Sequence, residues 1–172
     1  GQLTYQINPD NLGAVWFVKD VAYKQTPVEM MKALDSFNPK DTAFVYEKDK
    51  NLVNYSNQAD TTAAIWLISN QNDVVNYKSH SNANRFAVFS EIFYNKGWKA
   101  YIDGKESPIV QTNYVLRGLS IPAGEHEIKF EFKPSSYYLG EKLSIISSAI
   151  IWLLLIAAVV QFYLQQKKLT KE

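Results

Sequence analysis

HEIKFEFK, residues 126–133, alternates between two kinds of side chain along its whole length. One set is apolar or aromatic: His126, Ile128, Phe130 and Phe132. The other set is charged: Glu127, Lys129, Glu131 and Lys133. Because successive side chains of a strand point to opposite faces, this period of two predicts a β-strand with one face in a core and the other in water.

Seven more runs rich in β-branched and aromatic residues lie between turn residues, at 13–18, 42–48, 62–69, 74–79, 85–94, 99–103 and 114–121. TAAIWLIS (62–69) and RFAVFSEIFY (85–94) are apolar on both faces, which is typical of central strands covered on both sides. Many short strands without alternating helices favour a β-sandwich or jelly roll over an α/β sheet.

One amphipathic helix is predicted at TPVEMMKALDSF, residues 26–37. Thr26 can cap its first turn and Glu29, three residues later, completes a capping box. Met30, Leu34 and Phe37 recur at helical spacing. We therefore expect a mainly β domain with a single helix lying on a sheet.

The C-terminal part contains LSIISSAIIWLLLIAAVVQFYL, residues 143–164, which is 22 residues without a charge. A helix of this length can cross a hydrocarbon layer of about 30 Å. Aromatic and basic residues border the run as they do at membrane interfaces: Tyr137, Tyr138, Phe162, Tyr163, Lys167 and Lys168. We expect a β-sandwich domain over 1–139, a transmembrane helix over 140–166 and a basic tail over 167–172.

The orientation in the membrane follows from the lysines. Three lysines in the tail against one just before the helix, Lys142, place the C-terminus in the cytoplasm and the β-domain outside. Counting Lys129 and Lys133 as well makes the two sides equal. The stretch SSYYLGEK, residues 135–142, is interpreted as a short hinge.

The composition excludes several classes of function. Eighteen basic and 17 acidic residues give a formal net charge of +1, without the basic stripe that a nucleic-acid partner requires. The chain has no cysteine, its two histidines lie 46 residues apart, and it has no glycine-rich phosphate loop. We expect no cofactor, no metal and no catalytic residue in this chain.

Binding is the remaining possibility. An aromatic and polar surface for a sugar ring can be assembled from Tyr101, Asp103, Asn113, Tyr114 and Arg117. In the segment EIFYNKGWKAYIDGKE, residues 91–106, Trp98 is interpreted as a core residue, and Asp103-Gly104 as a two-residue hairpin turn. Tyr101 and Asp103 are the residues of this segment that keep a candidate ligand role.

Two stretches resemble the YfhO family of bacterial membrane proteins. They are SEIFYNKGWKAYIDGKESPIVQTNYVLRGLSIPAGEHEIKFEFKP (90–134), followed by a last membrane helix, and NLGAVWFVKDVAYKQTPVEMMKALDSFNPKDTAFVYE (11–47). The resemblance implies a multi-spanning glycosyltransferase that uses polyprenyl-phosphate sugars and modifies cell-envelope polymers outside the membrane. The acids expected to be catalytic in that family lie in an early loop that this sequence does not contain.

Two hypotheses follow. In the first, the chain is the C-terminal extracytoplasmic domain and last membrane helix of such an enzyme, cut from a longer protein because it begins with Gly1. Its partners would be the lipid bilayer, the upstream membrane helices, and an envelope glycan or polyprenyl-phosphate sugar. In the second, it is a single-pass anchored module that binds glycan or protein without catalysis. Neither hypothesis includes a nucleic-acid partner.

Overall fold

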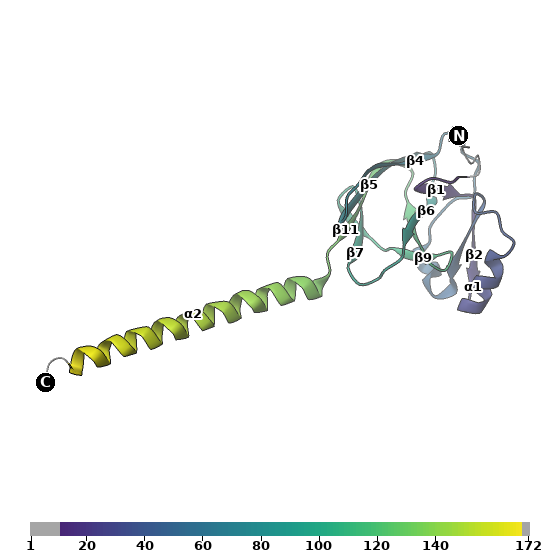
Figure 1. Ribbon diagram of the computed structural model, residues 1–172. Helices are drawn as coiled ribbons and strands as arrows, with labels where there is room; N and C mark the ends of the chain where they lie inside the picture. The colour runs from purple at the N-terminus through teal and green to yellow at the C-terminus, as the bar shows by residue number, and fades with distance from the viewer. Residues whose placement is uncertain (1–10, 170–172) are drawn as a thin grey trace, which may run out of the picture. The chain divides into compact units, whose positions relative to one another are not determined.

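The computed structural model describes residues 11–169, and the side chains of residues 11–161 (Figure 1). Its contacts divide the chain into two units at the bond between Lys133 and Pro134. The first unit consists mainly of two β-sheets and the second is a single helix. The predicted fold class, mainly β with one C-terminal helix fit to span a membrane, is confirmed.

The six-stranded sheet has the order β1-β6-β10-β9-β3-β2, formed by Val15–Val18, Arg85–Ile92, Leu116–Ile121, Val110–Thr112, Thr42–Tyr46 and Asp20–Lys24. The five-stranded sheet has the order β4-β5-β11-β7-β8, formed by Ala64–Asn70, Val74–Ser81, Gly124–Phe132, Trp98–Ile102 and Lys105–Ser107. Neighbouring strands are antiparallel except β2 and β3, which are parallel. Between the strands lie α1 (Pro27–Leu34) and the 3₁₀ helix η1 (Glu47–Leu52).

The main core lies between the two sheets. Ile128 and Phe130 of β11 are 1% exposed, so the strand predicted at 126–133 does bury one face. Phe130 meets Phe89 of β6 edge to face, with ring centres 4.8 Å apart, and Tyr77 of β5 meets Phe89 at 4.9 Å. These three rings join the sheets into a sandwich.

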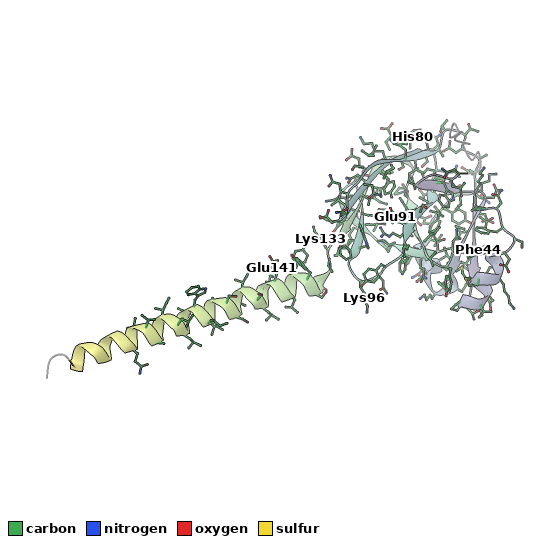
Figure 2. The ribbon with its side chains drawn as sticks, viewed as in Figure 1. Phe44, His80, Glu91, Lys96, Lys133 and Glu141 are labelled. Carbon is green, nitrogen blue, oxygen red and sulfur yellow. The ribbon has the colours of Figure 1, made fainter. Side chains whose placement is uncertain are left out.

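The helix α1 packs near the edge of the six-stranded sheet that β3 and β2 form, against Phe44 and Tyr46 of β3 (Figures 1 and 2). Its Met30 is completely buried. The Oγ1 atom of Thr26 accepts a hydrogen bond of 3.2 Å from the backbone N–H of Glu29, which is one half of the predicted capping box. The Glu29 carboxylate accepts its bond, at 3.1 Å, from the backbone N–H of Gln25 instead of that of Thr26. The predicted amphipathic helix is therefore confirmed, although it ends at Leu34 rather than at Phe37.

The two strands with apolar residues on both faces have different positions. β6 is central, lies between β1 and β10, and is buried from Arg85 to Phe89, as predicted. The prediction for 62–69 was wrong, because β4 is the edge strand of the five-stranded sheet. Its Trp66 and Ile68 are 45% and 51% exposed.

Three strands were not predicted from the sequence: β2, β8 and β9. They have three to five residues each, which is too few for a clear alternation of apolar and polar side chains.

The second unit is α2, which runs from Ser135 to Leu169 without interruption. Residues 135–142, predicted as a hinge, are helical; the bond from the backbone N–H of Tyr137 to the carbonyl of Pro134 begins the first turn. The apolar segment Ser135–Gln161 is 27 residues long, about 40 Å at 1.5 Å per residue, and enough to cross a membrane. Its side chains project from several sides of the helix, and none of its most apolar window is buried (Figure 2).

Candidate functional site

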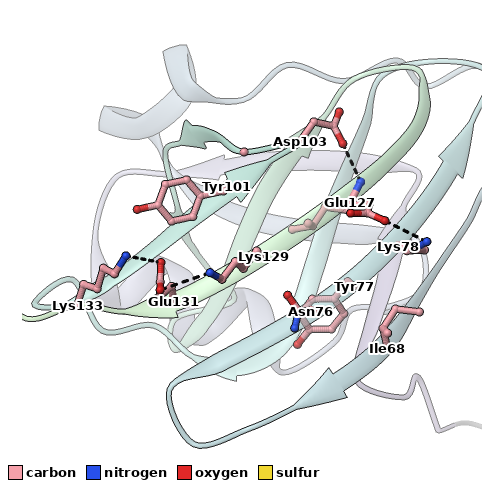
Figure 3. A pocket seen from close by; sticks show the side chains of 12 residues that line it. Ile68, Asn76, Tyr77, Lys78, Tyr101, Asp103, Glu127, Lys129, Glu131 and Lys133 are labelled. Carbon is pink, nitrogen blue, oxygen red and sulfur yellow. Dashed lines mark hydrogen bonds and ion pairs between the residues drawn. The ribbon is translucent and has the colours of Figure 1, made fainter.

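A groove of about 600 Å³ lies on the outer face of the five-stranded sheet (Figure 3). Side chains from β4, β5, β11 and β7 and from the turn after β7 surround it. Its lining consists of Ile68, Asn76, Tyr77, Lys78, Tyr101, Asp103, Gly104, Glu127, Ile128, Lys129, Glu131 and Lys133. We refer to this set of residues as the groove.

Strand register brings the polar residues of the groove together. Lys129 of β11 pairs with Asn76 of β5 on one side and with Tyr101 of β7 on the other. Glu127, two residues earlier and on the same face, pairs with Lys78. The alternation that buries Ile128 and Phe130 therefore also aligns these charged side chains on the outer face.

A β-bulge shapes the edge of the groove. The register between β4 and β5 shifts between Leu67 and Ser69, so that Ile68 is the extra residue. Ile68 lines the groove, and the Oγ atom of the next residue, Ser69, accepts a hydrogen bond of 2.9 Å from Asn76 Nδ2. The bulge thus gives the groove an apolar side chain at its outer strand.

The charges of the groove are paired. Lys78 Nζ lies 3.0 Å from Glu127 Oε1, on exposed side chains. Glu131 forms ion pairs with two lysines: its Oε2 lies 2.8 Å from Lys133 Nζ and its Oε1 lies 3.4 Å from Lys129 Nζ. The hydrogen bond from Lys133, followed by that from Lys129, holds the pKa of the Glu131 carboxyl below its usual value.

Asp103 closes the groove at the turn between β7 and β8. Asp103 and Gly104 have φ angles of 50° and 81°, as the predicted Asp-Gly turn requires. Asp103 Oδ2 lies 2.6 Å from His126 Nδ1, and Asp103 Oδ1 accepts a bond of 2.9 Å from the backbone N–H of Glu127. The bond to His126, then the bond from Glu127, lowers the pKa of the Asp103 carboxyl.

A second hollow of about 330 Å³ adjoins the groove and shares Lys78, Asp103 and Glu127 with it. It adds Trp66 of β4 and His80, which lies in β5 with Nδ1 3.8 Å from a Glu125 carboxylate oxygen. Within the part of the chain that the structure describes, no group of three or more His, Asp or Glu side chains is arranged to hold a metal ion. The groove and this hollow together offer stacking and hydrogen bonding, which are binding interactions.

Of the five ligand contacts predicted from the sequence, the structure brings two together. Tyr101 and Asp103 both line the groove. Asn113 and Tyr114 form the turn between β9 and β10 of the other sheet, where Asn113 Oδ1 accepts a bond of 2.8 Å from the buried backbone N–H of Phe44. Arg117 is 3% exposed and lies between the sheets. The five therefore do not form one surface, and a ligand role for any of them stays a prediction.

Several groove residues were missed by the sequence analysis. Lys129 and Glu127 stand on the charged face that the pattern of 126–133 predicts, but such a face is usually only solvated, and nothing in the sequence indicates its neighbours. Ile68, and Trp66 of the adjoining hollow, belong to a strand that was predicted to be buried but exposes both side chains. Lys78 had no distinguishing signal in the sequence.

Trp98, predicted as core, packs against the main core, and Ala100 is fully buried. At the start of α2, the rings of Tyr137 and Tyr138 lie 5.6 Å apart, and their side chains are 65% and 44% exposed. The other predicted interface residues lie outside the part whose side chains are described: Phe162, Tyr163, Lys167 and Lys168.

Comparison with known proteins identifies the family of the chain. The family model described as bacterial membrane protein YfhO matches residues 10–147, which is 138 of the 172 residues. No curated protein and no solved structure matches the chain. Because the match extends over both sheets and into the apolar helix, the chain belongs to the YfhO family of bacterial membrane proteins.

Proposed function

We propose that this chain is the C-terminal extracytoplasmic domain and last membrane helix of a polytopic glycosyltransferase. The enzyme would use polyprenyl-phosphate sugars to modify polymers of the cell envelope. In this proposal the β-domain binds glycan and presents it outside the membrane, while the chemistry takes place in another part of the protein.

The observation that carries the proposal is the groove on the five-stranded sheet. Tyr101 contributes an aromatic ring, and Asn76, Lys78, Glu127 and Lys129 contribute donors and acceptors to the same groove. A sugar ring presents an apolar C–H face and a rim of hydroxyl groups, which an aromatic ring flanked by polar side chains complements. Family membership and the apolar helix support a membrane setting for this groove.

The orientation can be tested with single cysteines, because the chain has none of its own. Lys105 lies in the exposed β7–β8 hairpin and lines neither hollow. A Lys105→Cys variant should react with a membrane-impermeant maleimide on intact cells, whereas Lys171→Cys in the tail should react only after permeabilisation. The reverse pattern would overturn the proposed orientation.

The enzymatic role can be tested in membranes that contain the whole protein of which this chain is part. Labelled sugar supplied as a polyprenyl-phosphate donor should enter envelope polymers in these membranes and not in membranes from a strain lacking the gene. Equal incorporation in both would refute the glycosyltransferase role. If, in addition, the complete gene encodes α2 as its single membrane span, the alternative hypothesis of a single-pass anchored binding module is favoured.

A further inference from the structure

We propose that the groove binds an uncharged, hydroxyl-rich segment of a glycan and excludes polyanionic segments. This inference rests on the proposed function, because it assigns a class of ligand to the same site. It follows from the charge, the hydrogen-bonding capacity and the spacing of the side chains in the groove.

Formal charges within the groove cancel. Its three lysines, Lys78, Lys129 and Lys133, are matched by three carboxylates, Asp103, Glu127 and Glu131. The adjoining hollow adds a further carboxylate, Glu125. Each lysine of the groove has a carboxylate beside it. A phosphate-rich polymer bound in the groove would therefore be attracted by the lysines and repelled by the carboxylates, and the two effects would offset each other.

The ion pairs leave capacity for hydroxyl groups. An ammonium group has three donors and a carboxylate has about four acceptor sites, so the Lys78–Glu127 pair at 3.0 Å uses only part of either group. Asn76 gives one donor to Ser69, which leaves its carbonyl oxygen and a second N–H. A hydroxyl group is both a donor and an acceptor, so it can accept a hydrogen bond from a lysine and donate one to a carboxylate at the same time.

The apolar contacts are widely spaced. Tyr101 of β7 and Ile68 of β4 lie at opposite sides of the groove, with strands β5 and β11 between them (Figure 3). Three strand spacings separate β4 from β7, about 14 Å in all. Trp66 lies on the same face as Lys78, is 45% exposed, and adds a third apolar contact in the adjoining hollow. Apolar side chains this far apart suit a chain of several sugar rings better than a single ring.

The test is calorimetric titration of the full chain in an amine-oxide detergent, whose headgroup contains no sugar. The probes are tetrasaccharides of glucose, mannose, galactose and N-acetylglucosamine, and poly(glycerol phosphate) as the polyanion. We expect at least one tetrasaccharide to bind and poly(glycerol phosphate) not to bind. Affinity for the tetrasaccharide should be nearly independent of salt, because no net charge is neutralised.

Two substitutions locate the site. Tyr101→Ala should weaken binding of the tetrasaccharide about ten-fold through loss of a stacking partner. Tyr94→Ala is the matched control, because Tyr94 is 51% exposed and lies outside the groove and the adjoining hollow. Equal effects of the two variants would contradict the assignment to the groove.

A charge variant tests the class of ligand directly. Glu127→Gln combined with Glu131→Gln removes the carboxylates that pair with the three lysines. This double variant should acquire salt-dependent binding of poly(glycerol phosphate), which the unmodified chain lacks. If the unmodified chain binds a tetrasaccharide but binds the polyanion more tightly, this inference fails while the proposed glycan binding stands. If it binds no tetrasaccharide, the proposed glycan-binding function fails as well.

Discussion

The guanidinium of Arg117 lies 4.2 Å from the centre of the Trp98 ring and 5.5 Å from that of Phe130, between the two sheets. Its Nε donates a hydrogen bond of 2.9 Å to the carbonyl of Ile92. Its Nη1 is buried and makes no hydrogen bond within the described part of the chain. Burial lowers the pKa of Arg117, with Glu91 and Tyr77 acting in the opposite direction. This residue contributes to the core mainly through stacking and packing.

The packing role of Arg117 leads to a prediction about its size and its charge. Arg117→Ala should lower the free energy of unfolding by about 3 kcal/mol, because it leaves a cavity beside Trp98. Arg117→Met keeps most of the volume and removes a desolvated charge, so its cost should stay under about 1.5 kcal/mol. Denaturant unfolding of the full chain in detergent, followed by tryptophan fluorescence, measures both. Equal losses for the two variants would mean that the charge itself is required.

Asn113 should be more tolerant of Gly than of Ala. Its φ angle is +47°, and its side chain satisfies the buried backbone N–H of Phe44. Both variants lose that hydrogen bond, at a cost of about 1–3 kcal/mol, but only Ala also strains the left-handed backbone, by about 1 kcal/mol more. The difference in unfolding free energy between the two variants measures this strain. An Ala variant as stable as the Gly variant would contradict the left-handed conformation.

Gly118 of β10 should not accept a side chain. A Cβ atom there would overlap the ring of Phe86, which is completely buried. Gly118→Ala should therefore destabilise the chain by about 1–3 kcal/mol through overpacking. Gly140→Ala is the control, because nothing lies within 4 Å of its Cβ position and alanine favours a helix. Melting temperatures of both variants should separate them clearly, and a neutral Gly118→Ala would refute the close contact.

Acid should destabilise the protein partly through Asp60. Its carboxylate accepts bonds from the Thr62 hydroxyl at 2.6 Å and from the backbone N–H of Asn82 at 2.7 Å. These bonds, led by that of Thr62, hold the Asp60 pKa well below its ordinary value of 3.8. Because the folded pKa is the lower one, the stabilisation is complete above pH 3.8 and is lost as the pH falls below it.

The Asp60 prediction is measured as the slope of unfolding free energy against pH. Asp60→Asn should lower stability at neutral pH and flatten the decline below pH 3.8, since the amide does not titrate. The decline should not vanish, because the Asp103 and Glu131 carboxyls also have lowered pKa values. An unchanged acid slope in Asp60→Asn would show that this carboxyl does not contribute to it.

Periodic and local signals made much of the fold predictable. The alternation of 126–133 predicted β11, the capping residues predicted α1, and the uncharged run predicted a helix long and apolar enough to span a membrane. Local patterns do not predict a property that depends on neighbours distant in the sequence. TAAIWLIS has the composition of a central strand, but it forms the edge of its sheet, and Trp66, Leu67 and Ile68 are exposed while Ile65 packs against the main core.

The site was less predictable than the fold. Tyr101 and Asp103 could be named because an aromatic residue and an Asp-Gly turn stand out in a sequence. Arg117 was predicted to lie on the surface. It pairs with Phe89, which belongs to the main core, so the side chain of Arg117 faces the same core. No local pattern distinguishes a strand arginine that faces solvent from one that stacks on a buried tryptophan.

By itself, the sequence determined the kinds of elements in this protein, because the periods of strands and helices and the length of an apolar span are properties of consecutive residues. It also determined the family, through the order of those elements. Only the tertiary structure decided which strands are central, which charged faces adjoin, and that Lys78, Tyr101 and Lys129 share a groove. These relationships depend on pairing between segments more than 20 residues apart, which backbone hydrogen bonds and core packing select together.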